Sequence, residues 1–398
     1  MATVTPQVIA PPVARAGAQR AGDPVLRLSV VIPCLNEADT IGMCVERAFR
    51  MLEANAIAGE VIVVDNGSLD GSAELARSAG ARVLLERRRG YGSAYMAGFE
   101  VACGEYVLMA DGDLTYDFDE APRFLAELEA GADVVIGNRM NNIHPGAMPW
   151  HHRYIGNPLL SGFLNLLFRT GVDDAHCGMR ALRRDALARL DLRTSGMEFA
   201  SEMVIRAAKE RLRVRQLEID YYPRGGDSKL ESFKDGWRHV RFLLVHSPNH
   251  LFIYPGMVMA TLGALVELVV ITRLPVLGRA WDIHALIAGG LLAIVGTQIV
   301  CLGVCARTYA AYFMGERDRL FSAVRARYRL EHGLVLGGAI GLAGGVLCAW
   351  IVIDWLRRGL GMLGDDKLAV VGATLVIIGV QIFFTSFLLS ILGLRRRA

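Results

Sequence analysis

The sequence predicts an α/β domain with a largely parallel sheet, followed by four transmembrane α-helices. Up to about residue 250, short apolar runs alternate with segments of helical spacing, a pattern typical of parallel sheets covered by helices. Beyond that point four longer apolar runs appear. With 53% hydrophobic residues in 398, the chain is too apolar for an ordinary soluble protein.

The strands and helices of the α/β domain follow one another along the chain. Apolar runs predict strands over 27–33, 60–65, 82–86, 106–110 and 133–138. Helical spacing predicts helices over 37–57, from 72, over 91–103 and after 119. Ligands bind at the carboxyl ends of strands in such sheets. The polar residues at these ends, namely Glu37, Asp65, Asp111 and Asn138, are therefore expected to line one cleft.

Two aspartates, Asp111 and Asp113, follow the strand at 106–110 with only Gly112 between them. Adjacent carboxylates repel each other unless a cation lies between them, and oxygen ligands suit Mg²⁺ or Mn²⁺. The pattern predicts a metal-assisted phosphate or pyrophosphate site. A turn with two solvated aspartates is the simpler alternative. A phosphatase of the haloacid dehalogenase type, with Asp111 as nucleophile, also fits the motif. An EF-hand loop does not, because Tyr116 stands where that loop needs glycine.

The apolar runs of the second half are each long enough to cross about 30 Å of hydrocarbon. They span 251–271, 283–305, 334–356 and 368–392. Lys and Arg are concentrated before the first run, in the loop 306–333 and in the tail 393–398. The positive-inside rule therefore places these parts, the α/β domain and both termini in the cytoplasm, at the plasma membrane. Glu267, near the end of the first run, is expected to reach the lipid headgroups.

Other segments complete the organisation of the chain. Residues 1–26 predict a disordered tail, and 229–250 predict an amphipathic helix in the membrane surface, with Trp237 on its apolar face. The seven scattered cysteines, without a C-x-x-C pair, are expected to be reduced thiols. A formal net charge of only +3 gives no indication of a nucleic-acid partner.

Eight blocks in order give the chain a resemblance to a known family. It resembles the inverting GT-A glycosyltransferases, which have a nucleotide-diphospho-sugar transferase fold, and especially the polyprenyl-phosphate branch of dolichyl-phosphate mannose and glucose synthases. The blocks are VVIPCLNE (30–37), VVDNGSLDG (63–71), RGYGSAYMAGF (89–99), MADGDLTY (109–116), DVVIGNRM (133–140), DAHCGMRAL (174–182), GMEFASEMVIRA (196–207) and the segment 224–229. The likeness covers about residues 28–245, and the domain is assigned to 27–228. A dehalogenase nucleophile normally lies on the first strand, which disfavours that alternative.

The resemblance implies roles for individual residues. Pro33, Leu35 and Glu37 would line the nucleoside pocket, and Asp65 would bind the base or ribose. Asp111 and Asp113 would hold Mg²⁺ or Mn²⁺ against the donor pyrophosphate, and Thr115 stands where many relatives have glutamine as a further ligand. The phosphates of donor and acceptor would be bound by Arg139, Arg180, Arg224, Ser228 and Lys229. For Arg180, an ion pair with Asp173 or Asp174 is the alternative.

The resemblance also implies a reaction, in which a hexose passes from a nucleotide sugar to a polyprenyl phosphate with inversion, giving a β-linked lipid sugar. Catalysis would rest on Asp111, Asp113, Arg139 and Arg224. UDP-glucose is favoured over GDP-mannose because the segments DGDLTYDF and GMEFASEM resemble those of glucose-type synthases more closely. A transferase acting directly on a glycolipid and an inactive membrane scaffold are the alternatives. The four spans would anchor one chain or pack between protomers in a homo-oligomer.

Overall fold

The computed structural model describes residues 26–225, 232–275, 278, 281–313, 330–360 and 366–394. It contains two compact units, Met1–Leu243 and Leu244–Ala398, which are treated separately below. The predicted tail 1–26 and the predicted basic segments 306–333 and 393–398 lie largely outside the described residues.

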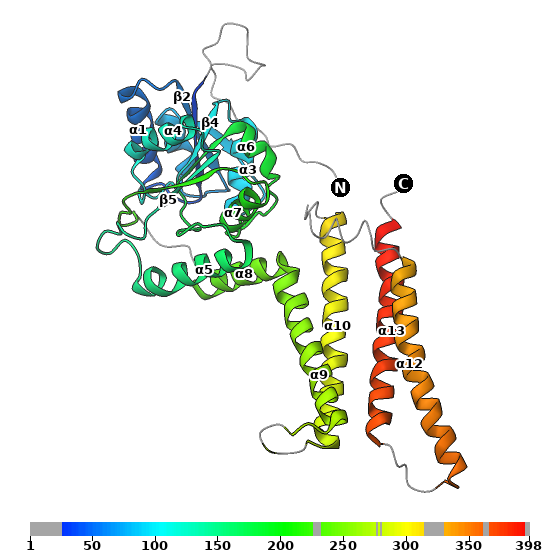
Figure 1. Cartoon of the computed structure of the whole chain (residues 1–398). Coiled ribbons are helices and arrows are strands. Elements are labelled where there is room, and N and C mark those ends of the chain that lie inside the picture. The colour runs from blue at the N-terminus through cyan, green and yellow to red at the C-terminus, as the bar shows by residue number, and fades with distance from the viewer. Residues whose placement is uncertain are drawn as a thin grey trace. The chain divides into compact units, whose positions relative to one another are not determined.

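A seven-stranded mixed sheet forms the centre of the first unit, as Figure 1 shows. Its strands are β1 (Leu28–Cys34), β2 (Gly59–Asp65), β3 (Arg82–Leu85), β4 (Tyr106–Met109), β5 (Val134–Asn138), β6 (Arg180–Arg183) and β7 (Val214–Glu218). They lie in the order β3-β2-β1-β4-β6-β5-β7. Only β6 runs antiparallel to its neighbours, which confirms the mostly parallel sheet. The register pairs Cys34 with Asp65, so β1 and β2 end together.

The helices of the first unit are packed around this sheet. They are α1 (Ile41–Ala54), α2 (Ser72–Ser78), α3 (Tyr91–Val101), α4 (Ala121–Glu129), α5 (Asn157–Phe168), α6 (Arg184–Leu190), α7 (Phe199–Lys209) and α8 (Ser232–Val245). The apolar residues of α1 recur at helical spacing, and Ile41, Val45, Ala48 and Leu52 are buried. The first four helices occupy the segments that the sequence predicted, with shorter bounds.

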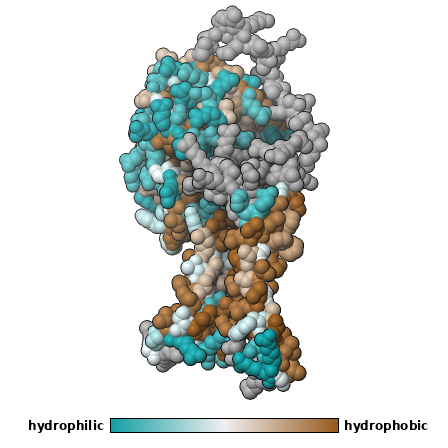
Figure 2. All heavy atoms as spheres, turned by 45° about the vertical axis from the view of Figure 1, so that its right-hand side comes forward, coloured by the Kyte–Doolittle hydropathy of each residue, from teal (hydrophilic) through white to brown (hydrophobic). Residues whose placement is uncertain are grey.

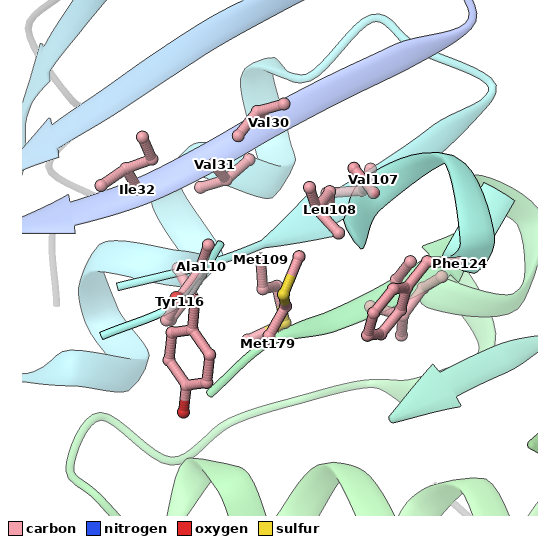
Figure 3. Close-up of a cluster of buried hydrophobic side chains, with 14 of the residues drawn as sticks. Val30, Val31, Ile32, Val107, Leu108, Met109, Ala110, Tyr116, Phe124 and Met179 are labelled. Atoms are coloured by element: carbon pink, nitrogen blue, oxygen red, sulfur yellow. The ribbon is translucent and has the colours of Figure 1, made fainter. Parts of the chain in front are cut away.

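Aliphatic side chains from β1 and β4 form the middle of the core, as Figure 3 shows. Val30, Val31 and Ile32 are fully buried, and Met109 pairs with Val31 in the sheet. Because side chains alternate between the two faces of a strand, a strand buried along its whole length must be covered on both faces. This rigid centre holds the turn that follows β4.

In the part of the second unit that the structure describes, four helices are long and apolar enough to cross a membrane, which confirms the four predicted spans. They are α9 (Tyr254–Thr272), α10 (Ile283–Phe313), α12 (Leu330–Arg357) and α13 (Asp366–Leu394), and α10 continues beyond the predicted end at residue 305. Figure 2 shows their outward surface covered with apolar residues. Between α12 and α13 the backbones touch at glycines, and a Cβ on Gly379 would lie 2.3 Å from the backbone nitrogen of Gly341.

Glu267 lies differently from the expectation that it reaches the headgroups. Its side chain on α9 is only 9% exposed, and its Oε1 accepts a hydrogen bond of 3.0 Å from the Thr374 hydroxyl of α13. A carboxyl group inside an apolar bundle is stabilised by such a donor. The expectation was wrong because it rested only on the position of Glu267 near the end of α9. It did not include the hydrogen bond from Thr374 on α13.

Candidate active site

The two aspartates of the D-G-D motif lie in a tight turn after β4. Leu114 adopts a left-handed conformation (φ 65°), which folds the chain back after Asp113. The Thr40 hydroxyl donates to the Gly112 carbonyl over 2.7 Å and joins the turn to the start of α1. Asp113 is buried, and its Oδ1 accepts hydrogen bonds from the Thr115 backbone nitrogen (3.1 Å) and hydroxyl (2.5 Å). Thr115 therefore orients Asp113 directly.

Asp111 is held by two tyrosines of α3. Its Oδ1 accepts from the Tyr91 hydroxyl at 3.0 Å and from the Tyr95 hydroxyl at 3.4 Å. Its Oδ2 lies against the bare backbone of Gly178, where a Cβ would be 2.4 Å away. Burial, with repulsion from Asp113 as the next cause, raises the pKa of Asp111 to about 7. The site therefore disfavours a second negative charge unless a cation compensates it.

This donor set fits a hard divalent cation. Asp111 and Asp113 offer carboxylate oxygens on one turn, and their mutual repulsion is the electrostatic situation that a bound cation relieves. Among the described residues no group of three His, Cys, Asp or Glu side chains could hold a metal. A site with few protein ligands suits Mg²⁺ or Mn²⁺, which keep positions for water and phosphate oxygens. Thr115 donates its hydroxyl hydrogen to Asp113, so we interpret it as a residue that orients a ligand.

Arg224 lies over the same turn. Its Nη2 donates to Glu37 Oε1 at 2.8 Å, and its Nη1 is 3.5 Å from Asp113 Oδ2. The segment that carries Arg224 is hydrogen-bonded to the motif, from Gly225 N to Asp113 O and from Tyr222 N to Thr115 O, both at 3.0 Å. The structure thus brings together residues 187 positions apart in the chain.

The predicted nucleoside residues lie at the ends of β1 and β2 and in the loop after β1, which is hydrogen-bonded to the segment after β2. The backbone nitrogens of Asn36 and Glu37 donate to the hydroxyls of Ser68 (2.9 Å) and Ser72 (2.8 Å). Asp65 is 5% exposed, and its Oδ1 accepts from the Ser68 backbone nitrogen at 3.0 Å. Pro33 lies in β1, one residue before its end, and Leu35 follows in the first of these loops. The roles of all four predicted residues in nucleoside binding stay predictions.

Arg180 is a structural residue in this fold. It is completely buried, and each guanidinium nitrogen donates to a backbone carbonyl, namely those of Cys177, Ala200 and Ala175. These bonds use three of its five N–H donors, and because the side chain has no exposed surface a phosphate cannot reach the others. This placement corrects the expectation that Arg180 binds a phosphate, and its partners are not the aspartates of the alternative.

Arg139 also has internal partners. It donates to both carboxylate oxygens of Asp174, at 2.7 and 2.9 Å, and its guanidinium lies 4.9 Å from the centre of the Tyr221 ring. Both residues of this ion pair are buried, and the Arg139 guanidinium holds the pKa of Asp174 below its ordinary value despite burial. We therefore leave Arg139 out of the proposed phosphate site. Ser228 and Lys229 lie outside the described residues.

Several residues of the site were not singled out from the sequence. Tyr91 and Gly178 belong to blocks that carry the family resemblance, and their place in those blocks was the available signal. What each contacts depends on chain segments far away in sequence. Spacing alone could not show this.

The first unit also exposes a group of large apolar side chains around α5. Each is more than half exposed, and they are Trp150, Tyr154, Ile155, Leu159 and Leu166. In α8, His239 and Leu243 are buried against the domain, whereas Trp237 is 59% exposed. Apolar surface of this kind, rimmed by polar residues, is typical of a membrane or protein contact.

Comparison with known proteins agrees with the resemblance. Residues 29–191 match the family described as glycosyl transferase family 2, and residues 304–393 match the glycosyltransferase family 2 C-terminal transmembrane region. The low-salt glycan biosynthesis hexosyltransferase Agl6 of Haloferax volcanii is 40% identical over 92% of this chain and 89% of its own length.

More distant relatives and a solved structure were also found. The dolichyl-phosphate hexose transferase of Haloferax volcanii is 34% identical over 52% of this chain and 89% of its own length. Glucosyl-3-phosphoglycerate synthase of Mycobacterium tuberculosis, solved with Mn²⁺, UDP-glucose and phosphoglyceric acid, aligns with a TM-score of 0.46 at 22% identity, over 58% of this chain and 86% of that one. With its transferase domain, its transmembrane region and a relative of such coverage, this chain belongs to glycosyltransferase family 2.

Proposed function

We propose that the protein transfers a hexose from a nucleotide sugar to a polyprenyl phosphate, with inversion, in a reaction that needs Mg²⁺ or Mn²⁺. The observation that carries the proposal is the pair of neighbouring carboxylates, half-buried Asp111 and buried Asp113, beside the guanidinium of Arg224 at the ends of the strands. Relatives named as a hexosyltransferase and as a dolichyl-phosphate hexose transferase support it. UDP-glucose is the favoured donor, and GDP-mannose is the alternative.

The acceptor requires no general base. A phosphate monoester has a second pKa of about 6, so its oxygen is already a nucleophile near neutral pH. It attacks the anomeric carbon of the sugar, and the bond from that carbon to the diphosphate breaks, with the electron pair leaving on the nucleoside diphosphate. One in-line displacement turns an α-linked donor into a β-linked product.

The protein's part in this reaction is position and charge. Asp111 and Asp113 would hold the divalent ion, which when bound neutralises charge on the departing diphosphate. Tyr91 and Thr115 orient these carboxylates through their hydroxyls. Arg224 supplies a cation between donor and acceptor, so that two polyanions can approach. Pro33, Leu35, Glu37 and Asp65 would form the nucleoside side of the site.

The reaction would take place at the cytoplasmic face of the plasma membrane. Four helices able to span a bilayer support the membrane location, and the distribution of Lys and Arg supports the orientation. The exposed apolar residues around α5 would contact lipid at the surface where the acceptor headgroup lies.

An assay with the full-length protein in lipid nanodiscs tests the proposal. The protein is incubated with Mn²⁺ or Mg²⁺, a polyprenyl phosphate, and UDP-glucose, GDP-mannose or other nucleotide sugars in turn. Mass analysis of the lipid fraction should show one hexose added with UDP-glucose, and NMR of the product should show a β linkage. Asp113→Asn should reduce transfer by about a thousandfold or more.

Other outcomes would identify the alternatives. Transfer only from GDP-mannose would change the donor and keep the reaction. Transfer only to a glycolipid, phosphate release without sugar transfer, or no reaction with any donor would contradict the proposal.

A further inference from the structure

Arg224 is the cationic residue beside Asp113 in the proposed metal site. It bridges Glu37 and Asp113, with contacts of 2.8 and 3.5 Å. The backbone of its segment is fixed on the D-G-D turn by the hydrogen bonds of Tyr222 and Gly225. Gly225 permits this approach, because a Cβ there would lie 2.5 Å from the Thr40 methyl group. The guanidinium is therefore held against the carboxylate that should bind the cation.

One donor of Arg224 is left unused in this arrangement. Its Nε is shielded from solvent and has no hydrogen-bond partner. A buried donor without a partner costs free energy, and the Arg224 guanidinium lies beside Asp113, one of the proposed metal ligands. The contact with Asp113, at 3.5 Å, is also longer than a good charge-assisted hydrogen bond. These features indicate a contact that is made in one state of the site and exchanged in another.

We propose that Arg224 is an internal counter-cation that the divalent metal ion displaces from Asp113, and that this exchange makes Arg224 available to the acceptor phosphate. The inference rests on the proposed function. A guanidinium and a divalent cation repel each other strongly when both lie within about 4 Å of one partly buried carboxylate. Arg224 must therefore leave Asp113 when the metal binds, while Glu37 keeps it nearby.

The exchange has a consequence for the affinity of the acceptor phosphate. Without metal and donor, the positive charge of Arg224 is used by Asp113 and Glu37 and is not offered to an acceptor phosphate. Once the metal neutralises Asp113, Arg224 faces the cleft with unused donors, including Nε. The lipid phosphate can then bind the Arg224 guanidinium, which was previously paired with Asp113. Metal binding and acceptor binding should therefore favour each other, and the coupling must be reciprocal.

Metal binding in the absence of sugar and lipid tests the exchange directly. Free Mn²⁺ is measured by electron paramagnetic resonance during titration of the full-length protein in detergent. Arg224→Gln removes the competing cation and should bind Mn²⁺ about tenfold more tightly than the wild type. Arg47→Gln is the matched control, because Arg47 is exposed on α1 and influences the pKa of Tyr222 nearby. It removes the same charge, and its effect should stay below about twofold.

A second titration tests the coupling. Binding of a short-chain prenyl phosphate should become about tenfold tighter when Mn²⁺ and UDP are present, and Arg224→Gln should lose most of this gain. Unchanged or weaker Mn²⁺ binding by Arg224→Gln would overturn the proposal, as would equal effects of the two arginine variants. Because no sugar is transferred in these titrations, failure of the exchange leaves the proposed reaction standing, and failure of transfer leaves the exchange measurable.

Discussion

The two units of this protein are packed by opposite rules. In the first unit, Met1–Leu243, which is called the catalytic unit below, the large aliphatic side chains point inward, and Val30, Val31 and Ile32 are completely buried. In the second unit, Leu244–Ala398, which is called the membrane unit below, such side chains point outward, and Val335 and Leu342 are about 70% exposed. Glycines make close contacts between its helices. Water drives apolar groups together, whereas lipid does not. Shape and polar pairs must therefore hold the spanning helices, and each rule can be tested by breaking it.

The largest effect is expected from the charge buried in the catalytic unit. Because the pKa of Asp111 is raised from 3.8 to about 7, the folded state holds its proton more tightly than the unfolded state. Without metal, this stabilisation is complete below about pH 4 and is lost as pH rises to 7, by roughly 4 kcal/mol. Chemical unfolding of the full-length protein with EDTA, at several pH values, measures the loss.

Asp111→Asn is the control for this pH dependence. The variant cannot ionise at this position, so the difference between its pH profile and that of the wild type isolates Asp111. Saturating Mn²⁺ should restore the stability of the wild type at pH 7 and leave the variant nearly unchanged. Parallel profiles for the two proteins would show that Asp111 ionises freely in the folded state.

The difference between the units also explains what the sequence could predict. Strands β1 to β5 are mostly apolar, and the four spans are long apolar runs, so pattern analysis recognises both. Strand β6 is four residues long with arginine at each end, and the buried Arg180 donates to three backbone carbonyls outside the strand, one of them on α7. Strand β7 carries Arg215, Gln216 and Glu218 in five residues. Such strands exist through tertiary contacts that no local pattern contains.

The site was predictable to a similar degree. The D-G-D turn is local, and its two aspartates could be named from spacing and chemistry. The partners of the arginines are not local, because Arg139 pairs with Asp174 and Arg224 with Glu37 across long stretches of chain. The sequence therefore indicated which residues are polar at the strand ends, and only the fold shows which of them neutralise each other.

A glycine exchange in the membrane unit should give the next largest effect. A Cβ on Gly337 would lie 2.6 Å from the backbone nitrogen of Phe383, so Gly337→Ala must separate α12 from α13. We expect a loss of about 1–3 kcal/mol. Gly338→Ala is the matched control, since nothing lies within 4 Å of its Cβ. Unfolding in mixed micelles measures both. Equal stabilities would mean that glycine contacts do not hold this helix pair.

A tyrosine exchange tests the catalytic unit more finely. Tyr91→Phe removes the 3.0 Å hydrogen bond to Asp111 and leaves the ring in place. Hydrogen bonds from neighbouring residues orient the side chains that bind a metal. The dissociation constant for Mn²⁺ should therefore rise about tenfold in this variant. Tyr95→Phe, whose contact is longer at 3.4 Å, should have a smaller effect on the same titration. A larger effect of Tyr95→Phe would reverse this assignment.

The smallest effect is expected from the polar pair inside the membrane unit. Thr374→Val removes the hydroxyl that donates to Glu267 across two helices and also the bond of that hydroxyl to Val370 O in its own helix. Thr308→Val removes only a bond within its own helix, to Val304 O. The difference in unfolding free energy between the variants isolates the contact between helices, which should contribute about 0.6 kcal/mol. A difference of several kcal/mol would mean that this one polar contact, and not the glycine packing, is the main stabilising interaction between the spanning helices.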